Sequence, residues 1–297
     1  MNWLLEPFRH EFMQRALFGC ALIGFTNGVL SGFIVLRRLA LMADALAHSL
    51  LPGLAIALIL FGFAPASLFL GALVAALFVA LGVQVISGSS RIKEDTSLGL
   101  LFACAFSLGL VLLSYSPVQV NISHYLFGNI LGLADSDLWI IYGIALLVLP
   151  TLVLLQRPLL LMMFQPAIAA TQGIRVKSLG YLLMALLVLA MIASLQAVGV
   201  ILALGMLIAP AATVYLCSDS FAAMFWGGGA IGMLGSCAGL FASYWLNLPS
   251  GACIVLMLGV IFFLAYLFSP KYGVLAKLLR RRRRHFHEES LARWEKF

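Results

Sequence analysis

The segment RRLALMADALAHSLLPGLAIALILFG, residues 37–62, decides the fold class of this chain. Two arginines are followed by an almost unbroken apolar run that ends at Gly62. A helix needs about 20 mostly apolar residues to cross a bilayer. In lipid, an apolar run of this length satisfies its backbone hydrogen bonds only as a helix. The segment therefore predicts a membrane-spanning helix with a basic end at Arg37 and Arg38.

The composition extends this prediction to the whole chain. Of its 297 residues, 63% are hydrophobic and 10% are charged, and the mean hydropathy is +1.09. An ordinary soluble domain is about 45–50% apolar and about 25% charged. A soluble enzyme is thereby excluded, and the length leaves no room for a separate soluble catalytic domain. We expect an all-α, polytopic membrane protein with about eight to nine transmembrane helices.

Further apolar runs mark the other crossings. They span residues 15–36, 65–87, 97–116, 138–156, 178–217, 221–245 and 250–268. The run 178–217 is about twice as long as one crossing needs. Gln196 and Gly199 near its middle indicate a hairpin, which makes nine crossings. A re-entrant segment is the alternative.

The basic residues give the predicted orientation. Lysines and arginines gather at 37–38, 91–93, 157–177 and 271–284, and such clusters face the cytoplasm. We interpret residues 1–297 as one transmembrane domain with an external N-terminus. Residues 1–14 are expected to form an interfacial helix, and residues 270–297 a basic cytoplasmic tail. Five of the positive charges behind the net charge of +7 are the run 280–284, which is expected to meet anionic lipid rather than nucleic acid.

Asp44 and His48 are the ionisable residues that stand out within a predicted span. A charge at the centre of a spanning helix costs about 2.5–3.5 kcal/mol, so such residues are functional candidates. Their spacing of four places both side chains on one helical face. A carboxylate and an imidazole together suit a divalent transition metal. A proton relay and a pair that only fixes helix packing stay open as alternatives.

The metal interpretation requires a second copy of the site. One chain offers two ligands here, whereas a metal takes four to six. A two-fold axis would bring two more ligands, so dimerisation belongs to the hypothesis. Pro52 and Gly53 follow His48 by one turn and are expected to loosen the helix there, freeing a carbonyl and allowing a kink.

Other polar groups are weaker candidates. His124, Asp135 and Asp137 lie in the outer connection 117–137, either around a vestibule or as solvated loop residues. The last polar cluster is metal-like in composition but follows five arginines, which favours a disordered tail; it comprises His285, His287, Glu288 and Glu289. The sequence has no GxxxxGK[ST] motif, so the chain does not bind ATP through a P-loop.

The inner connection 157–177 is predicted to contain a short helix of its own. Pro166 suits a first helical position, residues 167–170 favour a helix, and Gly173 suits its end. A short helix in a cytoplasmic loop could contact a soluble partner. It could equally be a connector that rests on the membrane surface.

Five motifs give the chain a family resemblance. They are LRRLALMADALAHSLLPG (36–53), RIKEDTSLGLLF (91–102), YLFGNILGL (125–133), QAVGVILALGMLIAPAAT (196–213) and LPSGACIVL (248–256). Together they resemble the membrane permease subunit of the manganese, zinc and iron ABC importer family, from about residue 12 to about residue 270. The first and fourth motifs are highly specific in combination, whereas each of the others is weak alone.

The resemblance implies a permease that pairs with a second copy or a paralogue in a bacterial cytoplasmic membrane. It implies cytoplasmic ABC ATPase subunits, which hydrolyse the ATP, and an extracytoplasmic metal-binding protein. Asp44 and His48 match the family's D-x-x-x-H motif on the metal path. The transported ion (Mn²⁺, Zn²⁺ or Fe²⁺) is the substrate, and no bound cofactor is expected.

The resemblance also assigns a coupling helix that contacts the ATPase. It maps onto about residues 165–174, and its candidate contacts are Gln165, Pro166, Ala167, Ala170 and Gly173. The family usually has Asp-Pro-Glu where this chain has Gln165-Pro166-Ala167. Acidic contacts to the ATPase are thus missing. A proton-coupled secondary metal transporter, with Asp44 and His48 as its relay, is the alternative function.

Overall fold

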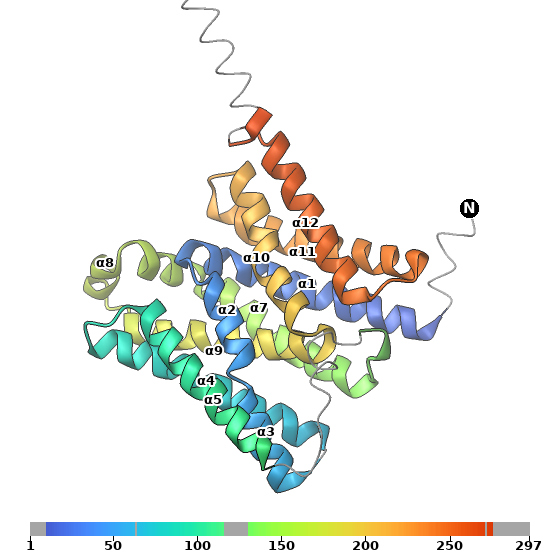
Figure 1. Cartoon of the computed structure of the whole chain (residues 1–297). Coiled ribbons are helices and arrows are strands. Elements are labelled where there is room, and N and C mark those ends of the chain that lie inside the picture. The colour runs from blue at the N-terminus through green and yellow to red at the C-terminus, as the bar shows by residue number, and fades with distance from the viewer. Residues whose placement is uncertain (1–9, 63, 116–129, 271, 276–297) are drawn as a thin grey trace, which may run out of the picture.

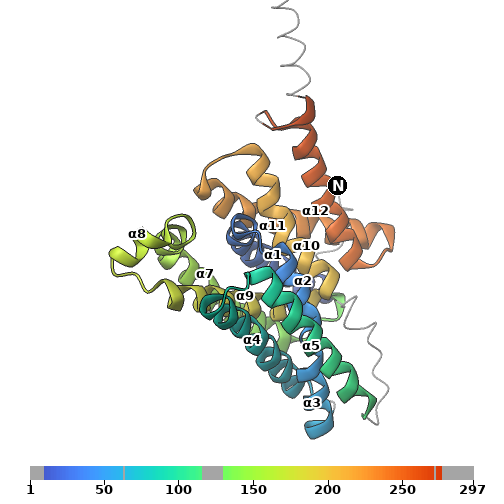
Figure 2. The same cartoon turned by 60° about the vertical axis from the view of Figure 1, so that its left-hand side comes forward.

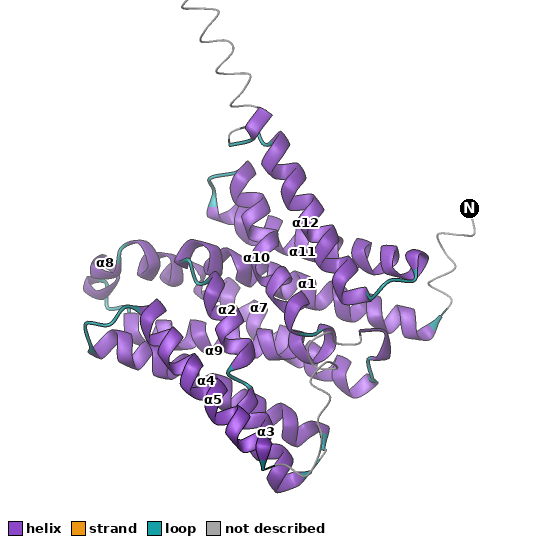
Figure 3. Cartoon of the chain, in the orientation of Figure 1, coloured by secondary structure: helices purple, strands orange, loops and turns teal. Residues whose placement is uncertain are grey.

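The computed structural model describes residues 10–62, 64–115, 130–270 and 272–275, and its described elements are all helical (Figures 1 and 3). The helices are α1 (Glu11–Arg37), α2 (Ala40–His48), α3 (Leu51–Phe61), α4 (Pro65–Ser89), α5 (Glu94–Ser114), η2 (Ile130–Gly132), α7 (Asp135–Phe164), α8 (Pro166–Thr171), α9 (Val176–Val198), α10 (Val200–Cys217), α11 (Phe221–Leu246) and α12 (Ser250–Phe268). The predicted all-α class is confirmed.

Eight helical segments in the described ranges are long and apolar enough to cross a membrane. One of them, Asp44–Phe61, joins α2 and α3 into a single pass. A ninth, shorter apolar helix covers Leu202–Cys217. At 1.5 Å per residue, the 18 residues of α10 extend about 27 Å, close to the thickness of a hydrocarbon core.

The long run 178–217 breaks at Gly199, as the sequence predicts. Gly199 has a φ of 84°, a conformation that glycine adopts without steric cost, and it separates α9 from α10. The start of α10 packs in one cluster with Met13, and its later Val214 packs near Leu36. Helix α10 therefore packs against α1 as a separate helix that follows the break at Gly199.

Helix α1 lies at the centre of the bundle and packs against α7, α9, α10 and α11 (Figures 1 and 2). The α1–α11 contact depends on missing side chains. A Cβ on Gly24 would collide with the carbonyl oxygen of Gly232, and one on Gly28 with that of Gly228. Small residues allow this close approach of two backbones, which drives helix association in lipid.

A polar contact fastens α1 to α10 where Pro210 interrupts the hydrogen-bond ladder of α10. The Ser31 hydroxyl donates to the Gly28 carbonyl at 2.7 Å and accepts from the Ala211 N–H at 3.0 Å. Ser31 is fully buried, so its hydroxyl satisfies backbone groups that have no access to water.

The second pass is broken directly after His48. Helix α2 ends there, and α3 begins at Leu51 with Pro52 in its first turn. Pro52 has no N–H to donate to the His48 carbonyl, which is the physical reason for the predicted loosening. Helix α3 then packs tightly on α4, where Gly53 and Gly71 face each other without side chains between them.

Helix α7 is longer than its apolar run suggests. It continues through Pro150 and Pro158 to Phe164, whereas the sequence places the crossing at 138–156. Neighbouring helices in a membrane re-satisfy backbone groups that a proline frees. Helix α1 begins at Glu11, inside the stretch expected to be interfacial. Residues 1–9 of that stretch and most of the 270–297 tail lie outside the described residues.

Candidate metal centre

Asp44 and His48 both lie on α2 and face the same way. The His48 Nε2 and Asp44 Oδ1 atoms are 3.8 Å apart. The Asp44 side chain is 56% exposed and the His48 side chain 36% exposed, although both lie in an apolar pass. At 1.5 Å per residue, His48 is about 15 Å along the pass from Arg38. The predicted shared face is thus present in the fold.

An apolar environment surrounds the inner side of this pair. The His48 ring lies 6.1 Å from the ring centre of Phe102 and 6.0 Å from that of Phe106, both on α5. Leu41, three residues before Asp44, is 75% exposed. Leu41, Asp44 and His48 therefore form one outward face of α2, and we call it the α2 face.

The α2 face holds two potential metal ligands. No group of three or more His, Cys, Asp or Glu side chains that could hold a metal occurs among the residues that the structure describes. An imidazole nitrogen and a carboxylate oxygen can bind Mn²⁺, Fe²⁺ or Zn²⁺, but two ligands leave half or more of the coordination shell empty. Within one chain, this arrangement offers two potential ligands.

The acidic residues of the outer connection have structural partners. The Asp135 Oδ1 atom lies 3.2 Å from the Arg15 Nε atom, which links the start of α7 to α1. The Asp137 Oδ2 atom accepts from the Ala134 N–H at 3.1 Å and so closes the first turn of α7. His124 lies outside the described residues, as does the tail cluster 285–289.

The short helix predicted in the inner connection is present as α8, Pro166–Thr171. Its Ala169 is fully buried and holds the helix against the bundle. The candidate coupling residues Gln165, Pro166, Ala167 and Ala170 are exposed. Gly173, just after the helix, has a φ of 79°, and the chain turns there into α9. The exposed side of α8 carries no acidic residue.

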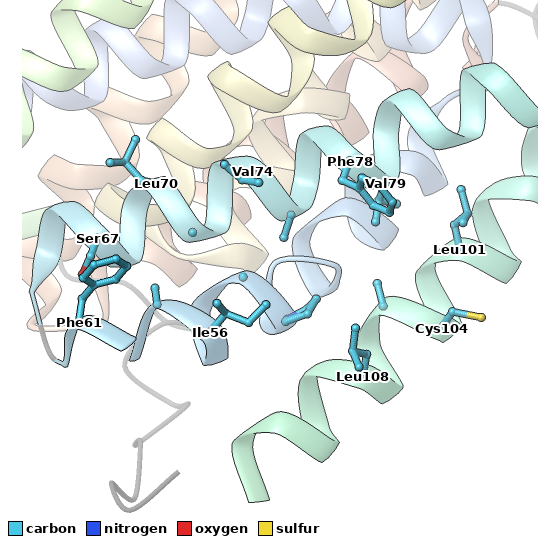
Figure 4. Close-up of a pocket in the computed structure, with 16 residues that line it drawn as sticks. Ile56, Phe61, Ser67, Leu70, Val74, Phe78, Val79, Leu101, Cys104 and Leu108 are labelled. Atoms are coloured by element: carbon cyan, nitrogen blue, oxygen red, sulfur yellow. The ribbon is translucent and has the colours of Figure 1, made fainter. Parts of the chain in front are cut away.

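A groove of about 720 Å³ opens between α3, α4 and α5 (Figure 4). Its labelled residues include Ile56 on α3, Val74 and Phe78 on α4, and Leu108 on α5. Its polar side chains are those of Ser67 and Cys104. One thiol and one hydroxyl are a poor ligand set for a hard or borderline cation, so the groove is not the metal centre.

Two contacts near the site were not predicted from the sequence. The aromatic contacts of His48 come from α5, and nothing in the spacing of Phe102 and Phe106 points to that histidine. Asn27, buried in α1, donates to the Ser194 hydroxyl of α9 at 2.6 Å. Polar residues inside apolar runs are the signal that could have found this second pair.

A transport-family model matches most of the chain. The model of the ABC 3 transport family matches residues 9–269. The chain belongs to the ABC 3 transport family. The resemblance drawn from the five motifs is therefore confirmed, and the chain is a multi-pass transport subunit.

Known transport proteins are similar to this chain over nearly their whole length. The manganese transport system membrane protein MntC of Halalkalibacterium halodurans is 42% identical over 275 residues, which cover 92% of this chain and 93% of that protein. A protein of Haemophilus influenzae named "probable iron transport system membrane protein" is 37% identical, over 93% of this chain and 97% of that one.

A solved structure shares the fold. The structure titled "PsaBC from Streptococcus pneumoniae in complex with Fab" aligns with a TM-score of 0.78 and 34% identity. The alignment covers 94% of this chain and 97% of the other.

Proposed function

We propose that this chain is the permease subunit of an ATP-driven importer of divalent transition metal. The ion passes by alternating access through a site that Asp44 and His48 form at the interface of two permeases. The observation that carries this proposal is the α2 face. A 56% exposed carboxylate in an apolar pass lies 3.8 Å from an imidazole. Left against lipid, that charge is costly, so its function requires a cation and a covering partner.

A second permease supplies the covering partner and the missing ligands for the cation. Two α2 faces related by a two-fold axis bring together two carboxylates and two imidazoles, which is a full tetrahedral set. With two added waters or carbonyls the same set becomes six-coordinate and suits Mn²⁺ or Fe²⁺. Desolvating a divalent ion inside a membrane requires such ligands. The whole chain, residues 1–297, then serves as one permease domain of this pair.

Manganese is the metal that the relatives favour. The MntC protein of Halalkalibacterium halodurans is named for manganese transport, and the Haemophilus influenzae protein for iron. The oxygen and nitrogen ligands of the α2 face accept both metals and also Zn²⁺. Manganese is therefore the first metal to test, followed by iron and zinc.

The ATPase subunits drive the permease through α8. The ABC ATPase subunits dock on the exposed side of this helix, around Gln165, Pro166, Ala167, Ala170 and Gly173. Closure of the ATPase dimer on ATP moves α8 and opens the permease pair outward, and hydrolysis reopens the inner side. The buried Ala169 supports this role because it ties α8 to the bundle. Since α8 offers no carboxylate, apolar contacts around Ile168 replace acidic ones.

The orientation follows the basic residues. The ends of α1, α4 and α7 carry or adjoin the Lys and Arg clusters and face the cytoplasm, and the C-terminal tail lies on the same side. The N-terminus faces outward, where an extracytoplasmic binding protein delivers the ion. The membrane is the bacterial cytoplasmic membrane.

Metal accumulation in cells tests the proposal. The chain is expressed with its ATPase and binding protein, and cellular Mn, Fe and Zn are measured by elemental analysis. We expect accumulation in the wild type, and its loss in His48→Ala, in Asp44→Ala and with a hydrolysis-dead ATPase. His10→Ala is the matched control, because His10 lies at the start of α1, away from the α2 face.

The rival function gives a different pattern. A proton-coupled transporter that uses Asp44 and His48 as a relay needs no ATPase. It would accumulate metal with the dead ATPase and stop when the proton gradient is collapsed at constant ATP. Unchanged uptake in both Asp44→Ala and His48→Ala would overturn the metal role of the α2 face.

A further inference from the structure

A second cavity, of about 360 Å³, lies at the basic end of the bundle, beside α8. It is enclosed by the last residue of α1, the ends of α4 and α7, and the start of α9, and Pro166 of α8 forms part of its wall. Its volume is within the range of about 300–1,000 Å³ that small-molecule sites occupy. The cavity is separate from the α2 face and shares no residue with it.

Both charged side chains that line the cavity are positive: Arg37 from α1 and Lys177 from α9. The lining residue Gln84 donates a hydrogen bond from its Nε2 atom to the Glu94 carboxylate at 2.7 Å. Glu94 itself does not line the cavity. The net charge of the side chains that line the cavity is therefore positive.

One donor atom of the Arg37 guanidinium lacks a hydrogen-bond acceptor in the described part of the chain. Its Nη1 atom is buried and has no hydrogen-bond partner among the described residues. A buried donor that carries charge and lacks an acceptor is strongly destabilising. Lys177 is exposed at the rim, so an anion that enters the cavity meets both cations. Tyr181 and Ser89 line the same space, and the Ser89 hydroxyl already donates to the Val85 carbonyl at 2.6 Å.

We propose that this cavity binds the phosphate group of an anionic phospholipid from the cytoplasmic leaflet. A phosphate oxygen matches the guanidinium fork of Arg37 and accepts from Lys177. The rest of the lining is mainly apolar, with Met162, Met163 and Val176, and it suits the glycerol and the first acyl carbons. Basic pockets between helix ends at the cytoplasmic surface are the usual place for such headgroups.

The bound phosphate would bridge α1 and α9 directly beside α8. The cavity and α8 share Pro166, and α9 follows α8 after the turn at Gly173. A lipid headgroup held there fixes the end of α1 and the start of α9, the helices next to α8. The proposal relies on the orientation given for the proposed function, but lipid binding is measurable without transport, so the two can fail separately.

Native mass spectrometry of the purified full-length permease tests the proposal. The protein is incubated with phosphatidylglycerol or with phosphatidylcholine, and the fraction that retains lipid is measured. We expect selective retention of phosphatidylglycerol. Retention falls about tenfold in Arg37→Gln and falls also in Lys177→Gln, since each variant removes one charge-assisted hydrogen bond.

Arg38→Gln is the matched control. Arg38 is the next residue, has the same charge, is exposed and does not line the cavity. Retention in Arg38→Gln should equal that of the wild type. An equal loss in Arg38→Gln and Arg37→Gln would show that surface charge alone attracts the lipid, and would overturn the proposal. Because the Lys177 side chain is exposed, its variant reports on binding even if Arg37→Gln fails to fold.

Two further arms separate other sources of the anion. Inorganic phosphate is added to the lipid-free permease, and its binding in place of phosphatidylglycerol would identify a free-phosphate site and contradict the lipid. Co-purification with the ATPase is measured in parallel. If Arg37→Gln loses the ATPase while it retains phosphatidylglycerol, the cavity serves a carboxylate of the partner and the lipid proposal is wrong.

Discussion

Asp44 is the single residue on which the proposed metal site depends most. Its carboxylate is 56% exposed on an apolar pass, and its near neighbour within the chain is the His48 imidazole at 3.8 Å. Removing the charge while keeping the shape separates a ligand from a packing residue. A packing residue tolerates an amide, whereas a divalent cation requires the anionic oxygen.

We predict that Asp44→Asn lowers manganese uptake about tenfold or more, which corresponds to about 1.4 kcal/mol of lost binding free energy. Uptake is measured with radioactive manganese in cells that express the complete importer. Asp95→Asn is the control, because Asp95 is an exposed carboxylate in the first turn of α5. Wild-type uptake in Asp44→Asn would show that Asp44 and His48 only fix helix packing.

At the scale of elements, the contact between α1 and α11 depends on glycines at the crossing. Gly28 and Gly228 place two backbones in direct contact, and a methyl group has no space there. Rigid backbone atoms on both sides cannot move aside as a flexible side chain would. The helices must separate instead, which weakens the dispersion contacts that hold membrane helices together.

We predict that Gly28→Ala destabilises the protein by about 1–3 kcal/mol, the usual effect of overpacking. Thermal unfolding in detergent, followed by tryptophan fluorescence, measures the change. Gly259→Ala on α12 is the matched control, because a Cβ there meets no atom within 4 Å. It should be neutral or slightly stabilising. Equal melting temperatures for both variants would mean that the glycine contact does not hold the fold.

At the scale of the whole molecule, the α2 face leaves a charged side chain on the outer surface of the bundle. The α2 face presents Leu41, Asp44 and His48 together, and Leu41 is 75% exposed. An exposed leucine on a membrane helix tolerates lipid, but the neighbouring carboxylate does not. In the proposed permease pair, the polar part of this face is the surface that the second permease covers.

We predict that Leu41→Cys, in a variant whose five native cysteines are replaced by alanine, cross-links two permeases through a bis-maleimide in native membranes. The product is a band of doubled mass, and added manganese should increase its yield because the metal joins the two faces. Phe263→Cys on α12 is the control, since it is 63% exposed but far along the chain from the α2 face. Cross-linking of Phe263→Cys alone would place the interface on the opposite helices. A paralogous partner would give a product of different mass.

The sequence by itself determined the all-helical class, the helix break at Gly199, the short helix at Pro166 and the shared face of Asp44 and His48. These features are local, because run length, helical spacing and the chemistry of Gly and Pro act within a few turns. Only the tertiary structure decided that Phe102 and Phe106 line His48, that Arg15 pairs with Asp135, and that Arg37 and Lys177 share one cavity. Those contacts join helices far apart in the chain. Spacing within one helix carries no information about which other helix packs beside it.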